Sequence, residues 1–263
     1  MLLVSGVMFR LKLVIFPLLL ILALSAQAAA SDKMTQLDVE KLIRHIDQLY
    51  RSESSYSELE MEIVTPHWQR TLAMQAWSKG MDKTFIRITS PKKEKGVATL
   101  RIENEMWNYL PKTNKVIKIP PSMMMSSWMG SDFTNDDLVK EFSLFEDFTY
   151  ELMDAEDGSD SLIQVNCIPH EDLPVVWGNI VTAVTKEDSM PVWQKYYSEE
   201  GELMRVLRYS DVTNFSGRTI PATMEMIPMN KQGHKTVIRY LKLEFNQKVD
   251  AEIFSLRNLR STN

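Results

Sequence analysis

The chain has 263 residues, and its 30 basic and 35 acidic residues give a formal net charge of −5. An acidic chain whose longest basic run is Lys92-Lys93 is a poor nucleic-acid binder, so we expect no nucleic-acid partner. Its single cysteine, Cys167, excludes an internal disulfide, so the chain must be stabilised by its own core.

The first 28 residues have the pattern of a cleavable signal peptide. Two basic residues precede an apolar run from Leu13 to Leu24, and a small-x-small site ends at Ala28. The run is shorter than the roughly 20 apolar residues of a membrane span. We therefore expect a signal peptide at 1–28 and one exported domain at 29–263, placed in the periplasm and not itself membrane-spanning.

The segments after the signal peptide predict one helix followed by a meander of strands. Leucine and isoleucine recur every three to five residues from Thr35 to Tyr50, which predicts a substantial amphipathic helix. Residues 57–65 alternate apolar residues with glutamate, which predicts a strand with one solvent-facing side. Turn-forming residues separate further predicted strands at Arg70–Ser78, Lys83–Thr89, Gly96–Glu103, Met106–Leu110 and Lys115–Ile119.

A methionine-rich connection follows, PPSMMMSSWMGSDFTNDDLV from Pro120 to Val139. Ser122 and Gly130 predict the start and end of a short apolar helix that carries Met124 and Trp128 on one side. We weigh three roles for this helix: packing in the core, a mobile cover over an apolar cavity, or a thioether copper site. Flexible methionine side chains suit surfaces that accept ligands of varied shape.

A copper site lacks supporting ligands. Met224, Met226 and Met229 form a second methionine cluster, but no histidine or cysteine lies within a few residues of either group. We therefore expect no metal and no cofactor.

A second short helix is predicted from Thr134 to Phe145, with Thr134 and Asp137 as its N-terminal capping box. Its neighbours Asp132 and Asp136, like Asp137, are better explained as residues of the helix start than as metal ligands.

Strands resume after this helix, and together with the first set they predict the fold class. They are predicted at Thr149–Asp154, Ser161–Ile168, Asn179–Lys186, Pro191–Ser198, Leu203–Asp211, Thr219–Ile227 and Thr236–Asn246. The prediction is a mainly β (α+β) domain: an incomplete antiparallel β-barrel or strongly curved sheet of about 11–13 strands, with an N-terminal helix and a short helical lid insertion.

Four segments carry a resemblance to a known family: MWNYLP (Met106–Pro111), KVIKIPPSMMMSSWMGSDFTNDDLV (Lys115–Val139), VVWGNI (Val175–Ile180) and FSLRNL (Phe254–Leu259). They are similar to outer-membrane lipoprotein-sorting proteins of the LolA/LolB-like superfamily. The resemblance implies a half β-barrel whose concave apolar face is covered by helices and holds acyl chains or other lipids. The chain departs from this family in being longer than LolA and in lacking the lipobox cysteine of LolB.

The resemblance also implies a function and its partners. We expect a periplasmic carrier or chaperone that binds lipid or the acyl chains of lipoproteins and shuttles them from an inner-membrane transporter to an outer-membrane acceptor. The alternatives are a soluble accessory of an inner-membrane lipid exporter of the RND/MMPL type and a periplasmic lipid-sensing regulatory module.

Candidate ligand-binding side chains fall into three groups, and all are expectations. Arg239 shares a predicted strand face with apolar residues, where it would tether the lid or a lipid headgroup, or pair with a glutamate at the end of the sheet. The lid residues are Met123, Met124, Met125, Trp128, Met129 and Phe133, and the lining residues are Trp107 and Tyr109.

An enzyme is not expected. The chain has no nucleophile elbow, zinc-protease motif or phosphate loop. The adjacent pairs Glu171-Asp172 and Asp136-Asp137 do not face one another on a strand or a helix, so neither makes a carboxylate dyad. We therefore expect no catalytic residue.

Overall fold

The computed structural model describes residues 36–139, 142–154, 161–173 and 175–261. The predicted signal peptide, residues 1–28, lies outside the described residues. The chain divides into two compact units, Met1–Asp38 and Val39–Asn263, and all of the strands lie in the second. None of the helices within the described ranges has the length and apolarity of a transmembrane span.

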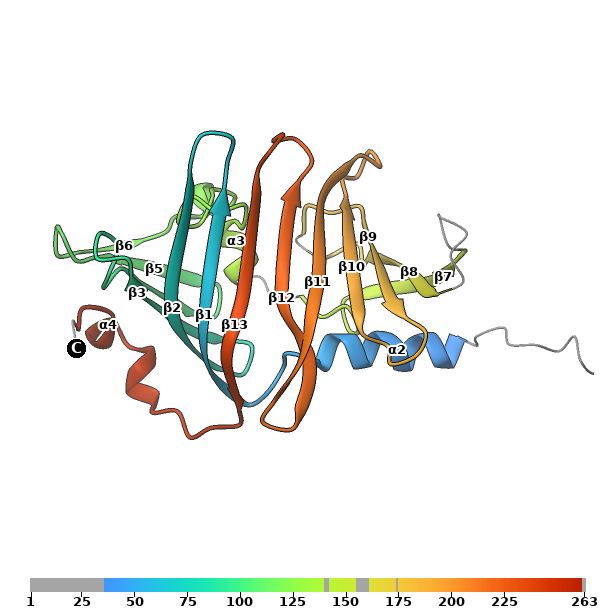
Figure 1. The fold of residues 1–263 in the computed structure, drawn as a ribbon, viewed down its shortest axis with the longest axis horizontal. Coiled ribbons are helices and arrows are strands. Elements are labelled where there is room, and N and C mark those ends of the chain that lie inside the picture. Colours follow the sequence, from blue (N-terminus) through green and yellow to red (C-terminus); the bar gives the residue numbers. More distant parts are fainter. Residues whose placement is uncertain (1–35, 140–141, 155–160, 174, 262–263) are drawn as a thin grey trace, which may run out of the picture. The chain divides into compact units, whose positions relative to one another are not determined.

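A single antiparallel sheet of thirteen strands dominates this unit, in the order β6-β5-β4-β3-β2-β1-β13-β12-β11-β10-β9-β8-β7 (Figure 1). Its outermost strands, β6 and β7, are not paired with each other, so the sheet does not close into a barrel. The strands are β1 Ser54–Val64, β2 Gln69–Lys79, β3 Lys83–Ser90, β4 Ala98–Ile102, β5 Glu105–Leu110, β6 Lys115–Lys118, β7 Phe148–Met153, β8 Leu162–Pro169, β9 Asn179–Thr185, β10 Pro191–Tyr197, β11 Leu203–Phe215, β12 Arg218–Pro228 and β13 Lys235–Phe245. The predicted fold class and strand number are confirmed.

Two meanders meet where β1 pairs with β13. The first runs from β1 to β6 and the second from β7 to β13. The β1–β13 ladder extends from Ser55–Phe245 to Val64–Lys235, with a bulge between Glu58 and Leu59. Strands far apart in the sequence therefore lie side by side in the middle of the sheet.

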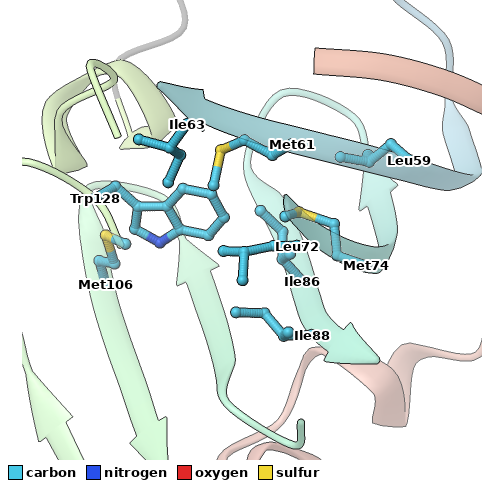
Figure 2. Packing of buried hydrophobic residues seen from close by; sticks show 9 residues of the cluster. All are labelled: Leu59, Met61, Ile63, Leu72, Met74, Ile86, Ile88, Met106 and Trp128. Carbon is cyan, nitrogen blue, oxygen red and sulfur yellow. The ribbon is translucent and has the colours of Figure 1, made fainter. Parts of the chain in front are cut away.

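The connection between β6 and β7, which we call the insert, packs on one face of the sheet. Of the insert, residues 119–139 and 142–147 are described. Apolar side chains from β1, β2, β3 and β5 meet Trp128 of the insert on this face (Figure 2). We call it the insert face. The members of this cluster are Leu59, Met61, Ile63, Leu72, Met74, Ile86, Ile88, Met106 and Trp128.

The C-terminal segment contributes to a second core, on the opposite face of β3, β4 and β5. Its two short helices are η2 Ala251–Phe254 and α4 Leu256–Leu259. Phe254 and Leu259 are buried against Phe85, Leu100 and Tyr109. The Arg87 side chain, also in β3, donates a hydrogen bond of 2.7 Å to the Asn258 carbonyl. We call this side of the sheet the C-terminal face.

The predicted first helix is α2, Gln36–Gln48, and its C-terminal end is tied to the sheet. Leu49 is buried with Phe215 and Ile220 in a third apolar cluster. The carbonyl of Leu49, left unsatisfied by the end of the helix, accepts a hydrogen bond of 3.2 Å from Arg218. Tyr50 donates a hydrogen bond of 2.6 Å to the Pro221 carbonyl. These contacts fix the residues after α2 against β12.

Candidate functional site

The methionine segment of the insert is not an α-helix, so the prediction of a helix from Ser122 to Gly130 is wrong. It begins with a 3-10 turn, η1 Pro121–Met123, and continues as turns. Met129 and Gly130 have φ angles of 53° and 76°, in the left-handed region, which an α-helix cannot contain. The Trp128 amide instead donates a hydrogen bond of 2.8 Å to the Phe133 carbonyl. Non-local hydrogen bonds within the insert override the helical periodicity.

The second predicted helix forms but is shorter than expected. It is α3, Asn135–Val139, and none of residues 142–147 is helical, so its predicted end at Phe145 is wrong. The capping box at its start is confirmed: the Thr134 amide donates to the Asp137 carboxylate at 2.8 Å, and the Asp137 amide donates to the Thr134 hydroxyl at 3.1 Å. Hydrogen bonds from Ser143 and Leu144 to Asp47 of α2 hold the chain after residue 141 in a non-helical conformation.

The three aspartates of the insert have different roles. Asp136 and Asp137 lie in the first turn of α3, as predicted. Asp132 lies outside the helix, where its carboxylate accepts a hydrogen bond of 2.8 Å from Thr236 of β13. Across the described ranges, no three His, Cys, Asp or Glu side chains are close enough to hold a metal ion.

Trp128 is a core residue that attaches the insert to the sheet. Only 4% of its surface is exposed, and it packs among Met61, Ile63 and Leu72 (Figure 2). Its indole N–H donates a hydrogen bond of 3.1 Å to the Thr99 hydroxyl on β4. A buried tryptophan needs such a partner for its polar edge.

The other predicted lid residues differ in exposure. Met124 and Met129 are partly buried against the Trp128 cluster. Met123 and Met125 are about half exposed, at 48% and 51%. The insert thus keeps some of its methionines on the sheet and others at the surface.

A buried ion pair joins α3 to β11. Arg205 donates two parallel hydrogen bonds to the Asp137 carboxylate, at 2.8 and 2.9 Å. The guanidinium also lies 4.3 Å from the ring centre of Trp177 and 4.4 Å from that of Tyr196. Such a bidentate, aromatic-flanked geometry is the strong form of an arginine–carboxylate contact.

The protonation state of Asp137 follows from these contacts. Burial alone raises the pKa of this carboxyl, but the hydrogen bonds and charge of Arg205, with the hydrogen bonds of Thr134, outweigh it and hold the pKa below its usual range. Burial raises the pKa of the neighbouring Tyr196 phenol to about 12. Around neutral pH the pair is therefore fully ionised and surrounded by neutral aromatic groups.

A second tether holds the insert to the end of α2. The Asp47 carboxylate accepts a hydrogen bond from the Ser143 hydroxyl at 3.0 Å and one from the Leu144 amide at 2.9 Å. Arg51 pairs with Asp47 at 2.9 Å and donates to the Phe142 carbonyl at 2.9 Å. Polar contacts therefore fix the insert at α3 and again at residues 142–144.

A cavity of about 440 Å³ lies between the insert and the insert face. Its Asp137–Arg205 end is near the β10–β11 turn, and its other end reaches the β2–β3 turn at Gly80 and Met81. The ion pairs Asp137–Arg205 and Asp47–Arg51 both lie in its wall. The apolar lining residues are Tyr50, Met81, Trp128, Phe133, Leu138, Phe142, Tyr196, Leu207, Met224, Met226, Ile238 and Tyr240.

The structure brings some of the predicted site residues together and separates others. Trp128 and Phe133 line this cavity, whereas Trp107 and Tyr109 belong to the core of the C-terminal face and are not among its lining residues. Arg239 also points away from the insert, because its neighbour Ile238 lies on the insert face. It pairs with Glu62 at 2.8 Å, in the middle of the central strand β13 and not at the end of the sheet.

Sequence reasoning missed Arg205 and Trp177 as site residues. Arg205, Leu207 and Tyr209 occupy every second position of β11 and so share one face of the strand. An arginine in an otherwise apolar row was the available signal for a buried, paired charge. Trp177 stands in the VVWGNI motif, directly before Gly178. A Cβ atom at Gly178 would lie 2.5 Å from the Ser198 carbonyl oxygen, so only glycine lets this loop approach the end of β10.

Comparison with known proteins agrees with the fold. The model of a family described as "Uncharacterized protein" matches residues 80–261. A DUF1329 family protein from Desulfovibrio piger has a TM-score of 0.72 at 23% identity, with 84% of this chain and 97% of that chain covered. No curated protein matches the chain.

Two further solved structures share this fold. A putative outer membrane lipoprotein-sorting protein domain from Vibrio parahaemolyticus has a TM-score of 0.70 at 20% identity, covering 84% of this chain and 98% of that chain. A LolA superfamily protein from Nitrosomonas europaea has a TM-score of 0.68 at 20% identity, covering 83% and 98%. The chain therefore belongs to the family that matches residues 80–261, and its fold is that of the LolA-like superfamily of outer-membrane lipoprotein-sorting proteins, as its sequence motifs predicted.

Proposed function

We propose that this protein is a periplasmic carrier that binds lipid, or the acyl chains of lipoproteins, in the cavity between the insert and the sheet. The single observation that carries the proposal is this cavity of about 440 Å³, bounded by aromatic, leucine and methionine side chains. Its volume falls within the range of about 300–1,000 Å³ that is usual for ligand pockets. The insert acts as its lid.

Apolar burial supplies the affinity. Each methylene removed from water contributes about 0.8 kcal/mol, so a sixteen-carbon chain gains roughly 12 kcal/mol before the losses of binding and ordering. Met224 and Met226 on β12 are flexible enough to follow an acyl chain. Binding of this kind requires neither a catalytic group nor a cofactor.

The Asp137–Arg205 pair holds the lid closed in our proposal. Opening the lid separates α3 from β11, and so it breaks a buried pair whose charges have few other partners. Cargo that enters must offset this loss with the apolar surface it buries. We propose an inner-membrane transporter as donor and an outer-membrane acceptor as receiver.

The experiment is native mass spectrometry with organic extraction on protein purified from the periplasm of its host. We expect the wild type to carry lipid or acylated protein and Met224→Trp to carry little, because the indole fills the cavity from β12 without placing a charge there. Its matched control is Leu241→Trp, at a β13 residue that is 61% exposed and does not line the cavity. Thermal unfolding of both variants checks that they fold.

Bound lipid in the wild type and Leu241→Trp, with loss in folded Met224→Trp, supports the carrier and identifies the cargo class. A wild type that is folded and free of lipid, or equal lipid in all three proteins, contradicts it.

A further inference from the structure

One end of the sheet carries a rim of four loop tips, which we call the cationic rim. The β1–β13 pairing ends at Val64–Lys235, which places the β1–β2 and β12–β13 turns at the same end (Figure 1). The pairs Ala73–Ser90 and Leu110–Lys115 place the β3–β4 and β5–β6 turns there as well. The rim comprises residues 65–70, 91–97, 111–115 and 228–234.

The tips contact one another. A Cβ atom at Gly233 would lie 3.1 Å from the Pro66 side chain, and one at Gly96 would lie 3.5 Å from Pro111. Arg70 and Glu94 join the β1–β2 and β3–β4 tips at 3.5 Å. The rim is therefore one connected surface built from four separate turns.

The charge of the rim is almost entirely positive. Lys92, Lys93, Lys95, Lys112 and Lys231 are all exposed. Within the described ranges none of these five has an acidic partner within 4 Å. The only acidic residue in the rim segments is Glu94, which is buried and paired with Arg70. A chain with a net charge of −5 thus concentrates unpaired positive charge at this end.

Two large apolar side chains project between these charges. Trp68 is 46% exposed at the β1–β2 tip, and Met229 is 51% exposed at the β12–β13 tip. The Thr65 hydroxyl accepts a hydrogen bond from the Trp68 amide at 3.1 Å, so the tryptophan sits on a fixed turn. Exposed tryptophan beside lysine is typical of surfaces that meet the membrane–water interface.

We propose that the cationic rim docks on the surface of an anionic phospholipid bilayer. Lysines beside the membrane gain about 1 kcal/mol each from anionic lipids. A bilayer surface adapts to separate convex tips, whereas a folded acidic protein would need a matching shape. The neighbouring β10–β11 turn carries Glu199, Glu200 and Glu202 and so limits the docking surface on that side.

Docking would bring the insert to the membrane. Trp68 and Lys93 share a cleft with Met129 and Gly130, and the adjacent Trp128 lines the lipid cavity. The rim would therefore present the lid of the carrier to the bilayer from which cargo leaves or into which it passes. This inference goes beyond the carrier proposal, because docking requires no cargo.

The test is co-sedimentation of the full protein with vesicles of phosphatidylethanolamine and phosphatidylglycerol, compared with phosphatidylcholine vesicles. We expect wild type to bind the anionic vesicles, with binding that weakens as salt is added. Lys93→Glu/Lys231→Glu should lower the partition coefficient at least about 30-fold. Trp68→Ala should also lower it, while retaining the salt dependence.

The matched control is Lys79→Glu/Lys248→Glu, which makes the same charge change at the opposite end of the strands. It should leave vesicle binding within about threefold of wild type, as should the cavity variant Met224→Trp. Absence of anionic-vesicle binding, equal binding to phosphatidylcholine, or equal loss in the control overturns the proposal. The proposal is also overturned if the rim binds an acidic protein and the chain binds neither kind of vesicle. That result would favour a protein partner.

Discussion

At the scale of single residues, Arg205 organises the candidate site. It bonds to Asp137 of the insert and lies against Trp177 and Tyr196 of the sheet side. Its Nε has no hydrogen-bond partner among the described residues, so the pair is held by its other two nitrogens. Removing one member of such a buried pair is costly because the other charge stays behind without a partner.

Arg205→Met should lower the free energy of unfolding at neutral pH by about 3–5 kcal/mol, measured by urea denaturation. The double variant Arg205→Met/Asp137→Leu should recover most of that loss, because no buried charge remains. Arg208→Met is the matched control on the same strand. Its side chain is 63% exposed, and the effect should be within about 0.5 kcal/mol.

The loss of stability in acid is a second test of the same ion pair. Since the pKa of Asp137 is lowered in the folded protein, the stabilisation is complete above the ordinary aspartate pKa of about 4 and is lost as the pH falls through the lowered value. The double variant should lack this part of the acid dependence. Equal stability of the single and double variants would contradict the role assigned to the pair.

At the scale of elements, the C-terminal segment is a structural strap on the sheet. The motif FSLRNL places Phe254 and Leu259 in the core of the C-terminal face, while Leu256 between them is exposed. The Ser255 hydroxyl accepts a hydrogen bond of 3.1 Å from the Asn258 amide and so caps α4. The strap thereby removes apolar surface of β3, β4 and β5 from solvent.

Phe254→Ala should destabilise the protein by about 3–5 kcal/mol, because it empties a buried aromatic site. Chemical denaturation measures the change. Leu256→Ala, in the same segment, should have an effect within about 0.5 kcal/mol. If both substitutions were equally mild, the strap would not be part of the core.

The sequence predicts the elements better than it predicts the site. Strand alternation and the Thr134–Asp137 capping box are local, so the meander and the start of α3 are found correctly. The conformation of the insert depends on distant partners such as Thr99 of β4, which binds Trp128, and the spacing of the methionines does not reveal them. The Asp137–Arg205 contact joins residues 68 positions apart, and no local pattern encodes it.

At the scale of the whole molecule, a single buried cysteine reports on opening of the sheet. Cys167 of β8 pairs with Tyr150 on one side and Ile180 on the other. Burial, partly offset by a hydrogen bond with Thr182, raises the pKa of its thiol to about 12. The thiol is therefore both inaccessible and un-ionised near neutral pH.

Alkylation of native Cys167 should be slow and should rise with urea in parallel with global unfolding, as measured by mass spectrometry after timed labelling. The variant Cys167→Ala/Ile168→Cys provides the control, since residue 168 is adjacent and 38% exposed and should react at once. Rapid labelling of Cys167 that does not respond to urea would mean that β7 opens locally.

The pairing of β1 with β13 also determines when the protein can fold. β1 is the first strand of the sheet and β13 the last, and the β1–β13 ladder joins the two meanders. Contacts between such distant segments form slowly, because a long stretch of chain must be closed before they contribute. A chain synthesised from its N-terminus leaves one hydrogen-bonding edge of β1 unpaired until the last strand arrives. The central seam of the sheet is thus completed only after synthesis of nearly the whole chain.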